Sequence, residues 1–250
     1  GAGSAYAQLP QPGRNAIASA LVAETATPAA GETVTLALVM KPDKGWHGYW
    51  KNPGDAGVPD RIEWQLPAGV AVGPLRYPVP QRLTVAGLMS YVYEGDYALL
   101  ADLRLPADIA PGTRLPVRAR FEYLACTDEI CVPEKRQLAL DLIVGSQPGP
   151  RASFDAYRRA LPKPLGNEGR FETRDGKFRL AVPLPASLPI SEIYFFPLTE
   201  NAIDYSAPQS ASRSGDTLII ETSAAPSPPP PIAGVLEIGE GDGLAFTSPP

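Results

Sequence analysis

The chain has 250 residues, a net charge of −5 at pH 7 and 44% hydrophobic residues. This length fits two domains of about 120 residues or one large β domain, and the apolar content is sufficient for packed cores. The chain contains no basic run and no apolar run of about 18 residues, which argues against nucleic acid, an anionic membrane surface or a membrane span as its partner or setting. Proline (30) and glycine (23) are frequent without a fixed period, which is typical of short strands joined by turns.

Alternating apolar and polar residues predict strands throughout the first half of the chain. The clearest strand is expected at residues 114–125, where every second residue is apolar and charged residues occupy the other face. A further strand at 135–144 follows it closely, so these two segments are expected to form a hairpin. Other extended segments are predicted at 16–24, 32–41, 61–66 and 97–105.

Two segments of the first half are expected to be loops. Residues 51–59, which follow the aromatic cluster at 46–50, contain Pro53, Gly54, Gly57 and Pro59, which disfavour a helix. Residues 67–87 are also rich in proline and glycine.

The linker candidate is the segment 145–150, with the sequence GSQPGP. It divides the chain into predicted domains at 1–147 and 148–250. A short helix is predicted at 153–161, where apolar residues share one face and Ser153 is the candidate N-cap. Short strands are expected after it at 170–174, 177–182, 192–197, 217–222 and 233–238.

Cys126 and Cys131 are the two cysteines of the chain, with four residues between them. Zinc usually takes four ligands, and this spacing is not typical of a zinc site, so no metal site is predicted. A structural disulfide and a redox-active disulfide are both compatible with the residues. A bridge here would stabilise the fold by about 2 kcal/mol in the chain-entropy model, and a chain of this length does not need that help. A short, exposed disulfide is the type that exchanges readily with thiols.

Acidic residues surround the cysteine pair in the sequence. Asp128, Glu129 and Glu134 are expected to raise the pKa of the thiols and to slow their spontaneous reactions. His47 is the single histidine of the chain and lies among aromatic residues far upstream. A Cys–His pair can activate a thiol, but a packed structural histidine is the interpretation that the sequence favours.

Leu88, Met89, Tyr91 and Tyr93 form an apolar group after a glycine, and the first three are the candidate cap residues. Ordinary strand packing explains such a group. The alternative is a cap that shields the cysteines until a partner displaces it.

Five motifs occur in an order that resembles the N-terminal periplasmic region of the DsbD/ScsB family of bacterial thiol:disulfide interchange proteins. The resemblance extends over about residues 14–145, and residues 150–250 resemble the extra segment of the longer, ScsB-like members. The motifs are Gly45–Gly57 (GWHGYWKNPGDAG), Ile62–Pro67 (IEWQLP), Tyr91–Gly95 (YVYEG), Tyr123–Cys126 (YLAC) and Cys131–Glu134 (CVPE).

The resemblance implies an all-β protein, with an immunoglobulin-like β-sandwich that carries the cysteines, followed by a second, smaller β-sandwich. It implies a protein-disulfide reductase without a cofactor, in which Cys131 forms mixed disulfides and Cys126 resolves them. Reducing equivalents would come from a thioredoxin-like domain of the same protein and pass to periplasmic thioredoxin-fold proteins. The cap would lie at 84–91, and the chain would be a soluble periplasmic segment of an inner-membrane protein. The alternatives are a binding module with a structural disulfide and a copper-handling domain.

Overall fold

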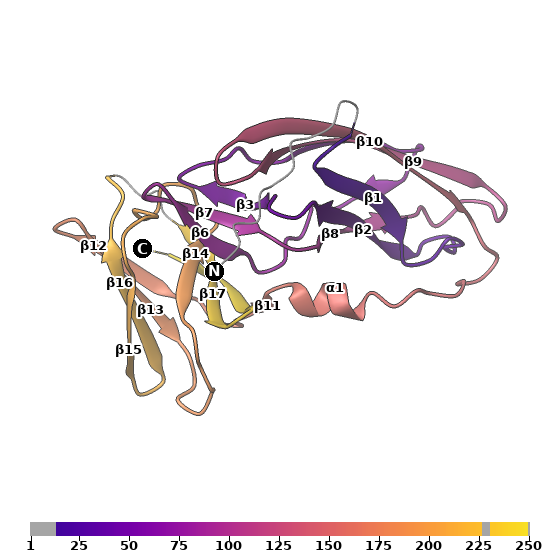
Figure 1. Cartoon of the computed structure of the whole chain (residues 1–250). Helices are drawn as coiled ribbons and strands as arrows, with labels where there is room; N and C mark the ends of the chain where they lie inside the picture. The colour runs from indigo at the N-terminus through magenta and orange to yellow at the C-terminus, as the bar shows by residue number, and fades with distance from the viewer. Residues whose placement is uncertain (1–13, 227–230, 250) are drawn as a thin grey trace. The chain divides into compact units, whose positions relative to one another are not determined.

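The protein is described by a computed structural model that covers residues 14–226 and 231–249 (Figure 1). It consists almost entirely of β-strands, and its one helix in these ranges is α1 (Asp155–Ala160). The all-β prediction is confirmed. Within the described ranges, no helix has the length and apolar character needed to cross a membrane.

The chain divides into two compact units that do not follow one boundary in the sequence. The first unit contains residues 14–49, 58–78 and 93–159, and the second contains 50–57, 79–92, 160–226 and 231–249. The predicted division at 147/148 differs from these units in two respects. Residues 148–159 belong to the first unit, and the segments 50–57 and 79–92 belong to the second.

The first unit is a sandwich of two antiparallel sheets. One sheet has the order β1 (Ile17–Ala23), β2 (Thr33–Pro42), β8 (Tyr97–Arg104) and β5 (Ala71–Val72). The other has the order β10 (Cys131–Ile143), β9 (Arg114–Cys126) and β4 (Arg61–Gln65). Alternate residues of both sheets fill one core, for example Leu38, Leu99 and Phe121. This arrangement is the expected immunoglobulin-like fold.

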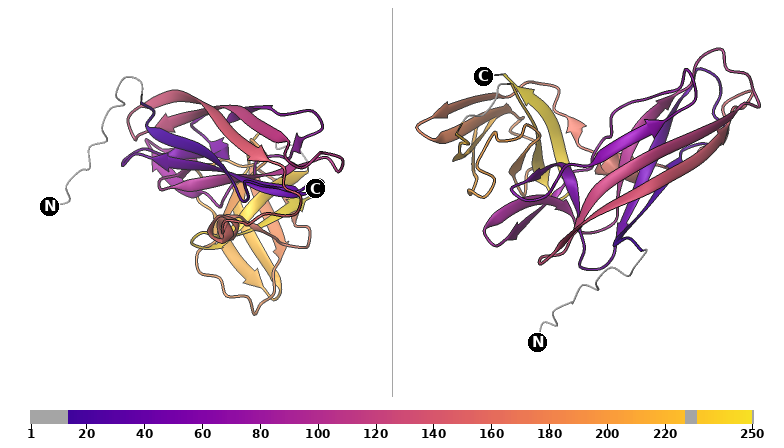
Figure 2. Two further views of the ribbon diagram at one scale, coloured as in Figure 1. Left: turned by 90° about the vertical axis from the view of Figure 1, so that its right-hand side faces the viewer. Right: turned by 90° about the horizontal axis from the view of Figure 1, so that it is seen from above.

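The β9–β10 hairpin is the longest feature of this unit and can be followed in both views of Figure 2. Each strand has 13 residues, and they pair without a break from Cys126 and Cys131 to Arg114 and Ile143. Every second residue of β9 from Leu115 is buried, as the period-two pattern predicts. The hairpin places the cysteines at its tip.

The second unit contains two four-stranded sheets. One has the order β11 (Lys163–Pro164), β18 (Asp242–Ser248), β17 (Ile232–Gly239) and β14 (Tyr194–Pro197). The other has the order β12 (Arg170–Arg174), β13 (Lys177–Pro183), β16 (Thr217–Ser223) and β15 (Ser210–Ser214). Phe178 of β13 stacks on Phe195 of β14, with ring centroids 6.0 Å apart, so the two sheets share an aromatic core.

A third small sheet contains β3 (Gly48–Gly54), β7 (Leu88–Tyr93) and β6 (Gln81–Val85). The predicted loops at 51–59 and 67–87 are therefore partly wrong. Trp50 is buried and packs against Tyr91 and against Phe196 of β14, with both centroid distances at 5.9 Å. This aromatic burial favours an extended chain. Pro53 is tolerated because β3 lies at the edge of its sheet.

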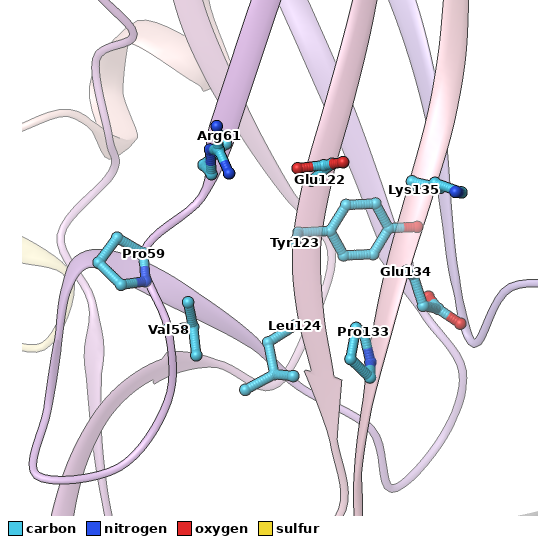
Figure 3. A pocket seen from close by; sticks show the side chains of 9 residues that line it. All are labelled: Val58, Pro59, Arg61, Glu122, Tyr123, Leu124, Pro133, Glu134 and Lys135. Carbon is cyan, nitrogen blue, oxygen red and sulfur yellow. The ribbon is translucent and has the colours of Figure 1, made fainter.

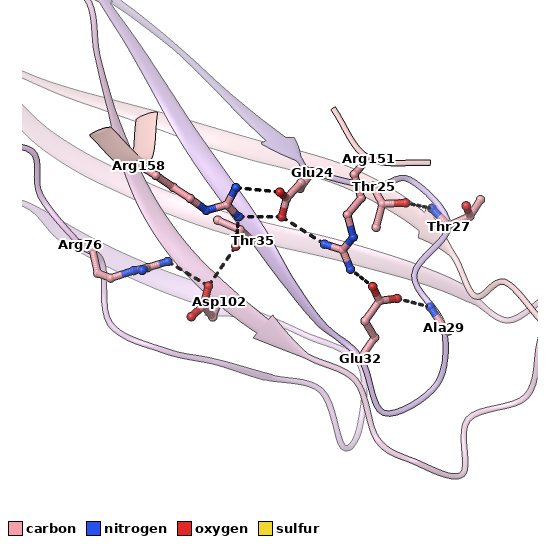
Figure 4. Close-up of polar contacts among 10 residues, drawn as sticks. All are labelled: Glu24, Thr25, Thr27, Ala29, Glu32, Thr35, Arg76, Asp102, Arg151 and Arg158. Carbon is pink, nitrogen blue, oxygen red and sulfur yellow. Dashed lines mark hydrogen bonds and ion pairs between the residues drawn. The ribbon is translucent and has the colours of Figure 1, made fainter. Parts of the chain in front are cut away.

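The segment after the linker is attached to the first unit by a buried carboxylate. Glu24 accepts two hydrogen bonds from the guanidinium of Arg158, at 2.8 and 2.9 Å, and one from Arg151 at 3.1 Å (Figure 4). Arg151 also pairs with Glu32, and Arg158 donates to Thr35 at 3.1 Å. Charge-assisted bonds of this kind explain why 148–159 pack with the first unit.

We predict that Glu24→Gln lowers the free energy of unfolding by about 1–2 kcal/mol at pH 7, because the arginines lose a charged acceptor. Arg158 lowers the pKa of Glu24, so the stabilisation is present above the ordinary value of 4.5 and is lost as the pH falls through the folded-state pKa. Urea unfolding of both proteins between pH 3 and 7 measures this. Glu63→Gln, at an exposed position of β4, is the matched control. An equal effect of both variants contradicts the prediction.

Candidate functional site

The two cysteines are joined in a disulfide across the tip of the β9–β10 hairpin. Cys126 and Cys131 are directly opposite in the strand register, and their Cα atoms are 4.1 Å apart. The backbone N–H of Thr127 donates to the carbonyl of Ile130 at 2.8 Å and closes the loop. The Thr127 hydroxyl accepts from the N–H groups of Glu129 and Ile130, both at 3.1 Å. Local hydrogen bonds therefore define the loop.

The two sulfur-bearing residues differ in exposure. Cys126 is 1% exposed, whereas Cys131 is exposed. Thiol–disulfide exchange needs a sulfur that an incoming thiolate can reach. Cys131 meets this requirement and Cys126 does not.

Cys126 is held by a second strand on the side away from Cys131. Its N–H donates to the carbonyl of His47 at 3.1 Å, and its carbonyl accepts from the N–H of His47 at 2.9 Å. Residues that exchange both hydrogen bonds in an antiparallel pair have their side chains on the same face. Because Ala125 faces the core, His47 and Cys126 share the opposite face of the sheet.

The His47 side chain is buried beside a tyrosine. His47 is 4% exposed, and its Nε2 lies 3.3 Å from the hydroxyl oxygen of Tyr49. Burial lowers the pKa of His47, and the carboxylate of Asp128 opposes this shift. The imidazole is thus neutral at pH 7 and lies within the electrostatic reach of the hairpin loop. The packed histidine that the sequence favours is present, but its strand also pairs with Cys126.

The three predicted acidic neighbours occupy different positions. Asp128 and Glu129 are exposed in the loop between the cysteines. Glu134 is buried instead, and its carboxylate accepts from the N–H groups of Ala16 at 2.6 Å and Ile17 at 3.0 Å. Glu134 is three positions after Cys131 and hence on the other face of β10. It anchors the start of β1, which differs from the predicted place beside the sulfurs.

The three predicted cap residues lie on β7, in the second unit. Tyr91 is fully buried, and its hydroxyl lies 2.9 Å from that of Tyr194. Leu88 is 48% exposed and Met89 is partly buried. Tyr91 therefore belongs to the aromatic core of its unit, and only Leu88 and Met89 offer apolar surface. The shielding role of these residues stays a prediction.

A groove of about 470 Å³ opens beside the hairpin in the first unit. Figure 3 shows Val58 and Pro59 on one side, and Leu124 and Pro133 on the other. Leu124 and Pro133 are opposite each other in the register and are each two positions from a cysteine. The period of two places them on the same face as the disulfide. The remaining lining residues are Arg61, Glu122, Tyr123, Glu134 and Lys135.

No group of three or more histidine, cysteine or acidic side chains that could hold a metal ion occurs within residues 14–226 and 231–249. The sequence did not indicate that His47 pairs with Cys126, and it placed Glu134 beside the sulfurs rather than at the start of β1. The pairing of His47 with Cys126 joins segments that are distant in the chain, and no local motif encodes it.

An immunoglobulin-like sandwich with one buried and one exposed cysteine in a hairpin-tip disulfide has the features that a thiol:disulfide interchange domain requires. The chain belongs to the family described as "Thiol:disulfide interchange protein DsbD, N-terminal", whose sequence profile matches residues 18–142. A search of the curated proteins finds no match.

Among solved structures, the chain is similar to the N-terminal periplasmic domain of ScsB from Proteus mirabilis. The identity is 14% and the TM-score is 0.66, over 97% of this chain and 95% of that one. The major pilin subunit BcpA of Bacillus cereus matches with a TM-score of 0.30 and 6% identity, over 92% of this chain and 62% of that one. At this TM-score the pilin carries no argument.

Gly48 lies between His47 and Tyr49 in the chain. Its missing side chain leaves space for the hydroxyl group of Tyr97. A Cβ atom at Gly48 would lie 2.0 Å from the hydroxyl oxygen of Tyr97, whose ring stacks on Tyr93 at 4.2 Å. The stacking limits how far Tyr97 can move. The glycine of this motif therefore permits the close approach of β3 to β8.

We predict that Gly48→Ala lowers the stability of the fold by about 1–3 kcal/mol, because Tyr97 must leave its position. Thermal unfolding measures the loss. Gly95→Ala is the matched control, since a Cβ atom there meets no atom within 4 Å. If the Gly48 and Gly95 variants unfold at the same temperature, the packing argument fails.

Proposed function

We propose that this domain relays reducing equivalents from a thioredoxin-like domain to partner proteins through the Cys126–Cys131 pair. The observation that carries the proposal is the unequal exposure of the two cysteines in one disulfide, with Cys126 buried and Cys131 exposed. Family membership supports the same chemistry. The activity is that of a protein-disulfide reductase.

The proposed reaction has two exchange steps in each direction. To load the domain, a partner thiolate attacks Sγ of Cys131, a new S–S bond forms, and the electron pair of the old bond leaves on Cys126. A second thiolate of the partner then releases Cys131 as a thiolate. To reduce a substrate, Cys131 attacks its disulfide, and Cys126 attacks Cys131 to release the substrate thiolate. These steps require no bound cofactor.

The groove beside the hairpin supports docking of a polypeptide next to the sulfurs. Its apolar residues Leu124 and Pro133 share the face of the disulfide and are flanked by the charged residues Arg61 and Lys135. A partner segment that lies in it would bring its own cysteine to Cys131. Thioredoxin-like proteins, which present a Cys-x-x-Cys pair, are the proposed partners.

The proposed compartment is the periplasm, and the proposed setting is a soluble part of a larger inner-membrane protein. The family description and the periplasmic ScsB domain support this setting. An oxidising compartment is where a reductase of protein disulfides has substrates.

A structural disulfide in a binding module is the alternative. The full 13-residue pairing of β9 with β10 argues against it, because the hairpin has no need of a cross-link at its tip. A structural bridge would have a reduction potential below about −300 mV and would resist a thioredoxin-like reductant. Copper handling is the other alternative, and tight copper binding that survives replacement of both cysteines would favour it.

We predict that Cys126→Ser accumulates a mixed disulfide with a thioredoxin-like partner through Cys131, because the resolving sulfur is absent. Cys131→Ser is the matched control and should accumulate none, since its remaining sulfur is buried. Non-reducing electrophoresis and mass spectrometry of the adduct measure this. Trapping through Cys126 instead, or in neither variant, would contradict the relay.

We propose that Leu88 and Met89 shield the disulfide, and the test is reduction by a small thiol. Leu88→Ser should increase the second-order rate constant of this reduction several-fold, because less apolar surface excludes the reagent. Ile143→Ser is the control, since Ile143 is similarly exposed at 52% and lies at the end of β10 away from the cysteines. Equal rates in the wild type and the Leu88 variant would refute the shield.

A further inference from the structure

We infer that His47 is the charge partner of the Cys126 sulfur, and that it gains a proton when the disulfide opens and loses it when the disulfide closes. This inference rests on the proposed function, because it concerns the thiolate that the relay creates on Cys126. It assigns a positioning role to the chain's single histidine.

The geometry places the two residues as nearest neighbours across two strands. His47 and Cys126 exchange both backbone hydrogen bonds, at 2.9 and 3.1 Å, which fixes the register between their strands. In such a pair the side chains leave the sheet on the same face, with Cβ atoms about 5 Å apart. The imidazole therefore lies beside the sulfur that the exchange reaction converts to a thiolate.

The reaction creates a need for this partner. Attack on Cys131 leaves the electron pair of the broken S–S bond on Cys126, which is 1% exposed. Burial in apolar surroundings raises the pKa of a thiol above about 8.5, and the protonated form does not attack. Without a nearby positive charge, Cys126 would be a poor nucleophile at neutral pH. It could not resolve the mixed disulfide quickly.

The surroundings of His47 suit a change of charge on opening. In the closed disulfide, burial keeps the imidazole neutral, with its Nε2 beside the Tyr49 hydroxyl at 3.3 Å. Among the described residues, the charged group that acts on the His47 imidazole is Asp128 in the hairpin loop. The carboxylate of Asp128 favours the protonated form of His47. A thiolate on Cys126 adds a second negative charge, so the imidazole takes up a proton from solvent and pairs with it. Closing the disulfide removes the thiolate and releases the proton.

The test uses the fact that the protein contains one histidine, whose ring signals are unambiguous in NMR spectra. We expect the pKa of His47 to be higher by about one unit in the chemically reduced protein than in the oxidised protein, as an adjacent opposite charge requires. Asp128→Asn should lower the pKa of His47 in both the oxidised and the reduced protein. The difference in this pKa between the two states should stay the same. An unchanged pKa on reduction overturns the inference. This measurement needs no partner and no variant of His47.

A second measurement follows the thiol itself. In reduced Cys131→Ser, the thiolate absorbance at 240 nm reports Cys126 alone. Adding His47→Gln should raise the pKa of Cys126 by about one unit, whereas adding Tyr49→Phe, which retains the imidazole, should have a much smaller effect. Equal thiol pKa values with and without His47 overturn the inference.

The two proposals fail in different ways. Trapping of a mixed disulfide by Cys126→Ser does not involve the imidazole, so its absence would refute the relay alone. With trapping intact, an unresponsive His47 would refute the charge partner alone. If both hold, the single variant His47→Gln, which retains both cysteines, should resolve its mixed disulfide more slowly near pH 7 than the wild type and recover as the pH rises.

Discussion

Cys126 is bonded on both sides, and the chemistry of the site depends on this. Its backbone pairs with His47, and its sulfur is joined to Cys131. The first interaction fixes the sulfur in the sheet, and the second leaves the other sulfur at the exposed tip of the hairpin. The Cys126 sulfur, held in this way, can break and re-form its bond to Cys131 without a movement of its strand. The exchange reaction then changes bonds while the fold stays constant.

Stability and chemistry are separated along the hairpin. From Leu115 to Ala125, every second residue of β9 packs in the core of the first unit, and Glu134 ties β10 to the start of β1. The opposite face carries the disulfide, His47 and the groove residues Leu124 and Pro133. Alternation along a strand makes this division possible, because neighbouring residues belong to different environments. In the proposed function, substrate contacts could therefore vary on one face without disturbing the packed face.

In the proposed relay, the acidic loop and the histidine would act on the sulfurs in opposite directions. Asp128 and Glu129 are exposed between the cysteines and disfavour thiolates by repulsion. An imidazolium beside Cys126 would favour one thiolate only, at the buried sulfur. In the proposed relay, this combination would restrain free reaction at Cys131 and support resolution by Cys126 within a docked complex. This balance suits a domain that transfers electrons to partners and avoids indiscriminate exchange.

The sequence by itself determined the strands with a clear period of two, the hairpin and the cysteine pair at its tip. It also carried enough motif order to indicate the family, which the profile match over residues 18–142 confirms. Only the tertiary structure decided that 48–54 form a strand, that Glu134 faces β1, and that His47 meets Cys126. Periodicity depends on neighbouring residues and is visible in any short window. Pairing between distant strands depends on the register of the whole sheet, which no local pattern encodes.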